Sequence, residues 1–283
     1  MKSIDLFSLS SVAGRVYIRQ CEQLQSLAIP LLTTVGGNLE LELRQAKVVL
    51  LPALRAIAGQ ANIRENYQMQ SLDLSKLAEI KKDCYLRENN QLAEISLPSL
   101  ISVNGQLEIN YNRQITRIVT AKLTKISNNL QVEANRRLRV ISMPELVSID
   151  SYVDIRNNPE LSALKDFGKL RTVARDFRIQ GNTKLQCVRG FSGITKIGGR
   201  LCLEQNSKLF MCDQVRPVSP ELAHRCCARW CASWTVAPRN HHSPLDLEAA
   251  PCFVACLQCD VDLLARARAR VHGGGSFSHS PVV

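Results

Sequence analysis

The chain is poor in aromatic residues, and it lacks long apolar runs. Aromatic residues make up only 5% of its 283 residues while Leu, Ile and Val are plentiful, so an aromatic-centred core is not expected. No apolar stretch approaches the roughly 20 residues that a membrane-spanning helix needs, and we therefore predict no membrane span. Residues 1–212 contain no histidine, which excludes a Ser-His or Cys-His catalytic pair from that part of the chain.

Targeting and cofactor signals are also missing. The N-terminal stretch MKSIDLFSLSSVAGRVYI has no apolar h-region of the signal-peptide type, and no N-x-[ST] sequon occurs. No phosphate loop or dinucleotide-binding motif occurs, so no cofactor is expected. The formal charge of +11 is spread among acidic residues, without a run of five or more basic ones. This pattern favours an ordinary solvated surface, and we expect no nucleic-acid partner.

A repeat of about 23 residues runs through residues 4–212. Its clearest copy is LPSLISVNGQLEINYNRQITRI, residues 97–118. The first apolar column of the nine copies holds Leu9, Leu32, Leu54, Leu77, Leu100, Leu123, Leu146, Leu170 and Ile194. Three residues later stand Val12, Val35, Ile57, Ile80, Val103, Ile126, Ile149, Val173 and Ile197. The spacing is 23 in most steps, 22 in one and 24 in two, and such a period is typical of a solenoid.

Each copy contains an alternating trio, such as Leu107-Glu108-Ile109, which is typical of a short strand. Alternation directs the outer two side chains inward and the middle one into solvent. Because so short a unit cannot bury its own apolar face, we expect the coils to stack and their strands to pair in parallel. The sequence therefore predicts a mainly β protein, a parallel solenoid of nine coils followed by an irregular C-terminal segment.

A column of asparagines follows the strands three residues after the last strand position. Its members are Asn66, Asn89, Asn112, Asn135, Asn158, Asn182 and Asn206, while Cys21 occupies the same place in the first coil. The chain must turn inward there, and Asn side chains can bond the backbone groups that leave the sheet. We therefore assign the column to structure rather than to chemistry.

The strands GQLEINYN and SYVDIRNN and the closing phrase NSKLFMC resemble the receptor L-domain family, the ligand-binding lobes of insulin-receptor-like and epidermal-growth-factor-receptor-like proteins. The resemblance implies a right-handed parallel β-helix or leucine-rich-repeat-like solenoid over residues 4–212. It also implies display outside the cell and binding of other macromolecules. The chain departs from that family in having more regular coils and no clear cysteine-rich module. The leucine-rich repeat is a second, partial resemblance, because its leucine stands one position closer to the strand.

We expect non-catalytic recognition of a protein or glycan ligand by a receptor-like, extracellular or cell-surface protein. A cytoplasmic leucine-rich-repeat-type scaffold is the alternative, which the missing leader and sequon favour. The apolar end of an uncapped solenoid favours instead a chain that has lost its leader and N-terminal cap. Tyr and Arg are enriched at binding hot spots, and the predicted contact patch comprises Arg64, Tyr85, Arg87, Tyr152 and Arg156. The other interpretation is that these charges pair across neighbouring strands.

An enzyme acting on polysaccharides is a further alternative, since right-handed β-helices also support such enzymes. Its carboxylates would have to cluster on adjacent coils. The candidates are Glu108, Glu133 and Asp154, which stand among Arg and Asn residues. With no histidine nearby, we expect the chain not to be an enzyme.

Composition changes after Cys212: Lys disappears, and all five His and six of the eleven Cys follow. We divide this part into a Cys-rich segment, residues 213–262, and a flexible tail, residues 263–283. The segment fits a disulfide-linked module, a poorly ordered region or a zinc site. Its ligands would come from His224, Cys226, Cys227, Cys231, Cys252, Cys256 and Cys259, but their spacing is not that of paired zinc knuckles, so no metal is assigned. A disulfide among Cys187, Cys202 and Cys212 would close the apolar end of the solenoid.

Overall fold

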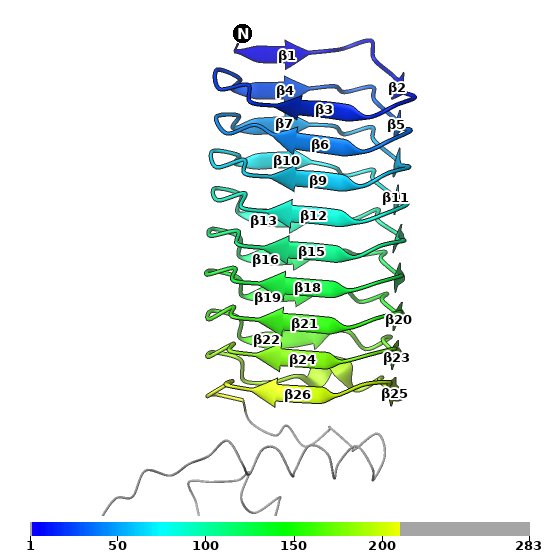
Figure 1. Cartoon of the computed structure of the whole chain (residues 1–283). Helices are drawn as coiled ribbons and strands as arrows, with labels where there is room; N and C mark the ends of the chain where they lie inside the picture. The colour runs from blue at the N-terminus through cyan, green and yellow to red at the C-terminus, as the bar shows by residue number, and fades with distance from the viewer. Residues whose placement is uncertain (1, 210–283) are drawn as a thin grey trace, which may run out of the picture. The chain divides into compact units, whose positions relative to one another are not determined.

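The structure is a computed structural model that describes residues 2–209. The segments 213–262 and 263–283, together with Cys212, lie outside the described residues. The described chain is a β-solenoid in which all neighbouring strands pair in parallel (Figure 1). In Figure 1 the chain runs rightwards along the back and leftwards along the front while it descends one coil, which is a right-handed path. The predicted mainly β solenoid with a 23-residue period is therefore confirmed.

Each coil contributes strands to three faces. The long-strand sheet has nine strands: β3 (Val16–Arg19), β6 (Leu39–Glu42), β9 (Ala61–Arg64), β12 (Cys84–Arg87), β15 (Leu107–Asn110), β18 (Leu130–Glu133), β21 (Val153–Arg156), β24 (Phe177–Gln180) and β26 (Leu201–Glu204). The short-strand sheet also has nine: β2 (Ser11–Val12), β5 (Thr34–Val35), β8 (Ala56–Ile57), β11 (Glu79–Ile80), β14 (Ser102–Val103), β17 (Lys125–Ile126), β20 (Ser148–Ile149), β23 (Thr172–Val173) and β25 (Lys196–Ile197).

The third face is divided into two four-stranded sheets. One contains β1 (Ser3–Asp5), β4 (Ser26–Ala28), β7 (Val48–Leu50) and β10 (Ser71–Asp73). The other contains β13 (Glu94–Ser96), β16 (Arg117–Val119), β19 (Val140–Ser142) and β22 (Ala163–Asp166). A short 3-10 helix, η1 (Arg189–Phe191), follows on the same side of the next coil.

The aliphatic columns form one continuous core along the solenoid axis. From Leu32 to Leu170 the first column is 0% exposed, and from Val35 to Val173 the second is at most 1% exposed. Each such side chain contributes roughly 2 kcal/mol of burial free energy, which no single coil could collect alone. Aromatic rings enter this core only near its C-terminal end, where Phe167 stacks on Phe191 with ring centroids 4.6 Å apart.

The three irregular steps of the repeat have local causes. The step of 22 falls in the second coil, where Leu43 directly follows β6 and takes the place that Asn66 holds in the next coil. One step of 24 comes from a register shift between β19 and β22, which accommodates one extra residue. The other step of 24 falls in the coil that contains η1. Phe191, the last residue of η1, stacks on Phe167, which stands 24 residues earlier in the chain. Insertions and deletions thus lie outside the long strands and leave the long-strand sheet in register.

The asparagine column is an interior ladder of hydrogen bonds. The backbone N–H of Asn89 donates to Oδ1 of Asn112 at 2.9 Å, and Nδ2 of Asn112 donates to the carbonyl oxygen of Leu86 at 2.9 Å. The same pattern repeats from coil to coil, and the ladder residues from Asn66 to Asn182 are 0% exposed. The structural role predicted for the asparagines is confirmed.

A left-handed residue precedes each ladder asparagine, and the sequence did not reveal this position. The residues with positive φ here are Gln20, Glu65, Glu88, Tyr111, Ala134, Asn157, Gly181 and Gln205. Only two of them are Asn or Gly, the types that adopt this conformation readily. The hydrogen bonds of the ladder hold the rest of the column in a conformation that costs each residue about 1 kcal/mol.

Candidate ligand-binding surface

The outward face of the long-strand sheet carries several groups of charged and aromatic side chains, two of which contain residues of the predicted contact patch. In the first group, Nη2 of Arg87 on β12 forms an ion pair with Glu108 on β15. The guanidinium carbon of Arg87 also lies 4.6 Å from the centre of the Tyr85 ring. The Tyr85 hydroxyl contacts Asp83 at 3.2 Å, and burial together with Asp83 raises the pKa of that phenol.

The second group lies on β18, β21 and β24. Nη2 of Arg156 donates to Glu133 at 2.8 Å, which raises the pKa of the guanidinium. Asp154 stands between two cations, with Oδ2 at 3.6 Å from Nε of Arg156 and at 3.6 Å from Nη1 of Arg178. Burial nevertheless raises the pKa of Asp154, because these contacts are too long to offset the loss of hydration.

The expectation that the middle strand residue lies in solvent is wrong at two positions. Glu108 and Asp154 are only 6% and 5% exposed, although both point away from the core. Arginine side chains from neighbouring strands lie over them, because the aliphatic part of Arg covers surface while its charged end stays hydrated. The alternating pattern therefore predicted correctly the direction in which these side chains point, but it did not predict their exposure.

The predicted contact patch falls into two parts. Arg64 and Arg87 are direct partners in the pairing of β9 with β12, beside Tyr85. Tyr152 and Arg156 lie three strands further along, about 14 Å away at the spacing of paired strands. Of the three arginines, Arg87 and Arg156 are held by carboxylates, and Arg64 approaches Glu42 only at 3.9 Å. Cross-strand pairing thus accounts for part of the patch, and its role in binding stays a prediction.

The three carboxylates named for catalysis are each engaged by arginine. Glu108 faces Arg87, Glu133 faces Arg156, and Asp154 lies between two guanidinium groups. A general acid needs free access to substrate, whereas Glu108 and Glu133 are held in ion pairs by arginine side chains here. The arrangement suits ion pairing along the sheet better than acid-base chemistry.

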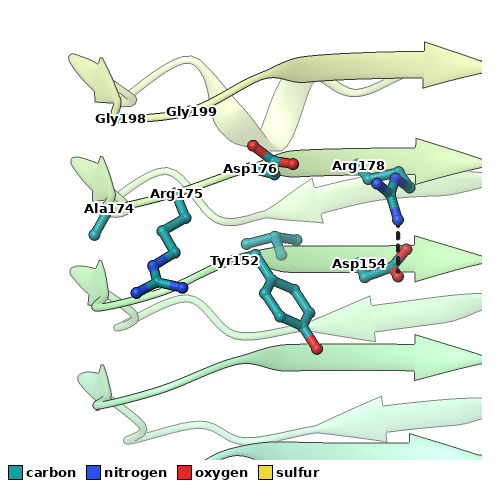
Figure 2. Close-up of a pocket in the computed structure, with 9 residues that line it drawn as sticks. Tyr152, Asp154, Ala174, Arg175, Asp176, Arg178, Gly198 and Gly199 are labelled. Carbon is teal, nitrogen blue, oxygen red and sulfur yellow. Dashed lines mark ion pairs between the residues drawn. The ribbon is translucent and has the colours of Figure 1, made fainter.

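A groove of about 440 Å³ opens at the N-terminal ends of β21 and β24, and the sequence did not reveal it. It is lined by Tyr152, Val153, Asp154, Ala174, Arg175, Asp176, Arg178, Gly198 and Gly199. Figure 2 shows the Tyr152 ring between Arg175 on one side and the ion pair of Arg178 with Asp154 on the other. Ala174 and Gly198 stand at equivalent places in adjacent coils, and Gly199 stands opposite Arg175; these small residues leave the space open.

A recurrent Asx–Gly pairing shapes the floor of this groove. Oδ1 of Asp176 accepts a hydrogen bond from the backbone N–H of Arg200 at 2.8 Å, which lowers the pKa of Asp176. A Cβ atom on Gly199 would lie 2.3 Å from that oxygen, so glycine is required in the next coil. Asn38 with Gly59 and Asp83 with Gly105 repeat the arrangement. The spacing of these pairs was the signal available in the sequence.

Among residues 2–209, two polar groups at the groove are left without a full set of partners. The side chain of Asp154 is 7% exposed, yet its Oδ1 atom has no hydrogen-bond partner. Arg175 is exposed and forms no ion pair with any residue in the range 2–209. A buried acceptor and a free donor at one groove can bind a ligand that carries both hydrogen-bond donors and acceptors.

Cysteine chemistry is not prominent in the described coils. Burial raises the pKa of the Cys84 thiol to about 12, which makes it an inert apolar residue. The backbone of Cys187 pairs with that of Ala163 in β22 on the third face, whereas Cys202 lies on β26 of the long-strand sheet. Between residues 2 and 209, no cluster of three or more His, Cys, Asp or Glu is placed to hold a metal ion. The proposed zinc ligands lie outside the described residues, as does Cys212.

The described residues include no helix that is long and apolar enough to cross a membrane. Comparison with known proteins gave no match to any family model, to any curated protein or to any solved structure. The resemblance to receptor L-domains therefore rests on the repeat pattern, and the structure supports its coarser part, a parallel β-solenoid.

Proposed function

We propose that the solenoid is a non-catalytic recognition module of a receptor-like or cell-surface protein, which binds a protein or glycan ligand on its long-strand sheet. The observation that carries the proposal is the groove beside Tyr152, where neither the buried Oδ1 of Asp154 nor the Arg175 guanidinium has a partner in the part of the chain that the structure describes. A buried polar atom without a hydrogen bond costs about 1–3 kcal/mol, and a ligand donor would recover that free energy.

The geometry favours an extended ligand anchored at one point. Nine parallel strands in register give a continuous surface, and one groove near its C-terminal end supplies a specific contact. Tyr152 provides an apolar ring with a polar end, Arg175 a planar donor, and Asp154 an acceptor. The remaining ion pairs along the sheet would affect the orientation of the bound ligand more than its affinity.

The test is a binding screen of the full chain against a glycan array and a panel of purified secreted ectodomains. The double variant Tyr152→Ala with Arg175→Ala should weaken any specific ligand about tenfold or more, since hot-spot residues contribute 1–3 kcal/mol each. The control Lys47→Ala with Arg55→Ala removes exposed basic residues elsewhere and should leave binding unchanged. Full binding by the groove variant would contradict the proposal.

The predicted contact patch is tested in the same screen. The triple variant Tyr85→Ala, Arg87→Ala and Arg156→Ala should abolish capture of the ligand if the patch extends the groove. Its melting temperature should fall, because Arg87 and Arg156 pair with the buried carboxylates of Glu108 and Glu133, so capture is compared at a temperature at which the variant remains folded. Retained capture would confine the ligand to the groove. Turnover of an acidic or neutral polysaccharide that disappears on Glu133→Gln would instead favour an enzyme.

A further inference from the structure

A separate basic feature lies after the C-terminal ends of the long strands, at the opposite end of those strands from the groove. This arginine corner consists of Arg113, Arg117, Arg136, Arg137 and Arg139, all of them exposed. None of the five lies within ion-pair distance of a carboxylate in residues 2–209. By contrast, the arginines of the long-strand sheet at positions 19, 87, 156 and 178 are all paired.

The backbone stacks these arginines on two adjacent coils. The N–H of Asn112 donates to Oδ1 of Asn135 at 3.0 Å, so the residues that follow, Arg113 and Arg136, are neighbours across the coils. A hydrogen bond of 3.2 Å from the N–H of Leu138 to the carbonyl of Asn135 closes a tight turn, with Arg136 and Arg137 at its tip. Because adjacent coils are about 4.8 Å apart, the five side chains project from a small area of the surface.

The other two arginines extend the corner onto the third face. The N–H of Arg139 donates to the carbonyl of Thr116 at 2.9 Å, which places Arg139 across from the residue before Arg117. No acidic residue occurs in the two segments that form the corner, 111–118 and 134–141. Five like charges therefore repel one another in the free protein, and a bound polyanion would relieve that repulsion.

Carboxylates limit the corner on both sides. Glu94, one coil before, is the direct strand partner of Arg117, and Glu160, one coil after, is paired with Lys184 at 2.7 Å. A long anionic strand running along the solenoid would meet these carboxylates, whereas a short one crossing it between the two coils would not. Tyr111, 50% exposed and held at φ 59°, stands two residues before Arg113 at the start of the same turn and adds an exposed aromatic ring to this end of the strands.

From this arrangement we propose that the arginine corner binds a sulfated saccharide. The planar guanidinium group forms paired hydrogen bonds with oxyanions such as sulfate, and clustered sulfates match clustered arginines. The Tyr111 ring can cover the apolar face of one sugar ring. A single aromatic side chain offers little to a nucleic acid, whose sequence-independent binding relies on stacking several bases. The site is distinct from the groove and does not depend on the function proposed for it.

The experiment measures binding of the full chain to a heparin-derived octasaccharide by calorimetry at several salt concentrations. Replacing Arg113, Arg136 and Arg137 with Ser should weaken binding about tenfold or more. It should also reduce the slope of log K against log salt by about 2 to 3, as expected for three lost ionic contacts. The matched control Lys47→Ser, Arg55→Ser and Lys82→Ser removes the same charge from other exposed positions. It should change affinity less than threefold.

Further measurements separate the effect of positive charge from that of the guanidinium group and of the sulfate groups. The variant in which the same three arginines become Lys keeps the charge and should bind at an intermediate level, and it serves if the Ser variant does not fold. De-sulfated octasaccharide should not bind. Equal losses in the Ser variant and the matched control would overturn the site. A single-stranded DNA oligonucleotide that binds as tightly, with the same dependence on Arg113, would overturn the assignment to a sulfated saccharide.

Discussion

Two ladders of polar side chains run along the solenoid, one inside it and one on its long-strand sheet. Inside, each asparagine from Asn66 to Asn182 is fully buried, and both its donor and its acceptor are bonded to the backbone or to the next asparagine. Outside, arginines and carboxylates pair across strands, but Oδ1 of Asp154 and Nε of Arg156 keep no hydrogen bond. The inner ladder is complete in itself, whereas the outer one leaves groups that a ligand can bind.

The difference shows how one repeat can serve both stability and recognition. Burial without water makes every missing hydrogen bond costly, so every coil from Asn66 to Asn206 keeps asparagine in the inner column, and only Cys21 and Leu43 at its start differ. On the surface, water solvates unpaired groups, and the outer column varies freely in residue type from coil to coil.

The largest effect is expected for Asn112→Ala in the inner ladder. The change removes the acceptor of the Asn89 N–H and the donor to the Leu86 carbonyl, both of them buried. At 1–3 kcal/mol for each orphaned group, the free energy of unfolding should fall by about 4 kcal/mol in urea denaturation. Asn62→Ala, an asparagine of the outer surface on β9, should cost less than about 0.5 kcal/mol. Similar losses in the two variants would remove the distinction between the ladders.

A smaller loss is expected for Gly199→Ala at the groove. Its Cβ would lie 2.3 Å from Oδ1 of Asp176 and 2.8 Å from backbone atoms of Arg175 and Asp176, so the carboxylate must give up its bond to the Arg200 N–H and the backbone must shift as well. Overpacking and the lost hydrogen bond together should cost about 2 kcal/mol, measured as a lower melting temperature. Gly14→Ala, with nothing within 4 Å of the added Cβ, is the matched control and should be nearly neutral.

A gain in stability is expected where the backbone is left-handed without glycine. Ala134 has φ 55°, and Ala134→Gly should stabilise the protein by up to about 1 kcal/mol because glycine adopts this conformation without steric cost. The reverse change, Gly181→Ala, should destabilise it, since the added Cβ would lie 2.6 Å from Oδ1 of Asn157. Denaturation midpoints of both variants measure these changes. A loss of stability for Ala134→Gly would contradict the prediction that glycine is favoured at this left-handed position.

The ion pairs of the outer ladder should contribute little. A double-mutant cycle with Arg156→Ala and Glu133→Ala should give a coupling energy of about 0.5 kcal/mol, because the arginine is a third exposed. The coupling should shrink further at 1 M salt, where such pairs are screened. A coupling energy above 2 kcal/mol would show that the outer ladder contributes as much to the free energy of unfolding as the inner one does.

The smallest effect concerns Asp154. Its pKa is raised in the folded protein by burial, so the stability that it contributes is present below its ordinary value near 3.8 and is lost as the pH rises through the raised one. Asp154→Asn carries no such loss. The stability of the variant relative to the natural protein should therefore increase slightly from pH 3 to pH 7. A constant or falling difference would show that Arg156 and Arg178 outweigh burial.

The sequence predicted the fold well because its signal is repeated nine times. The two apolar columns and the asparagine column fixed the coil register, and alternation in trios such as Leu107-Glu108-Ile109 gave the direction of each strand side chain. The surface was harder to predict. Arg175 escaped notice because its importance depends on Ala174, Gly198 and Gly199 from neighbouring coils, which lie beside it only after stacking.

The sequence by itself determined the period, the strand direction and the buried columns, since these follow from side-chain alternation and from the need of each coil to cover its neighbour. The tertiary structure alone decided which charges pair and which stay free. Residues 23 positions apart, such as Glu133 and Arg156, become neighbours, while Arg113 and Arg136 meet without a carboxylate between them. Ion pairing acts over a few ångströms, and only the stacked coils set distances on that scale.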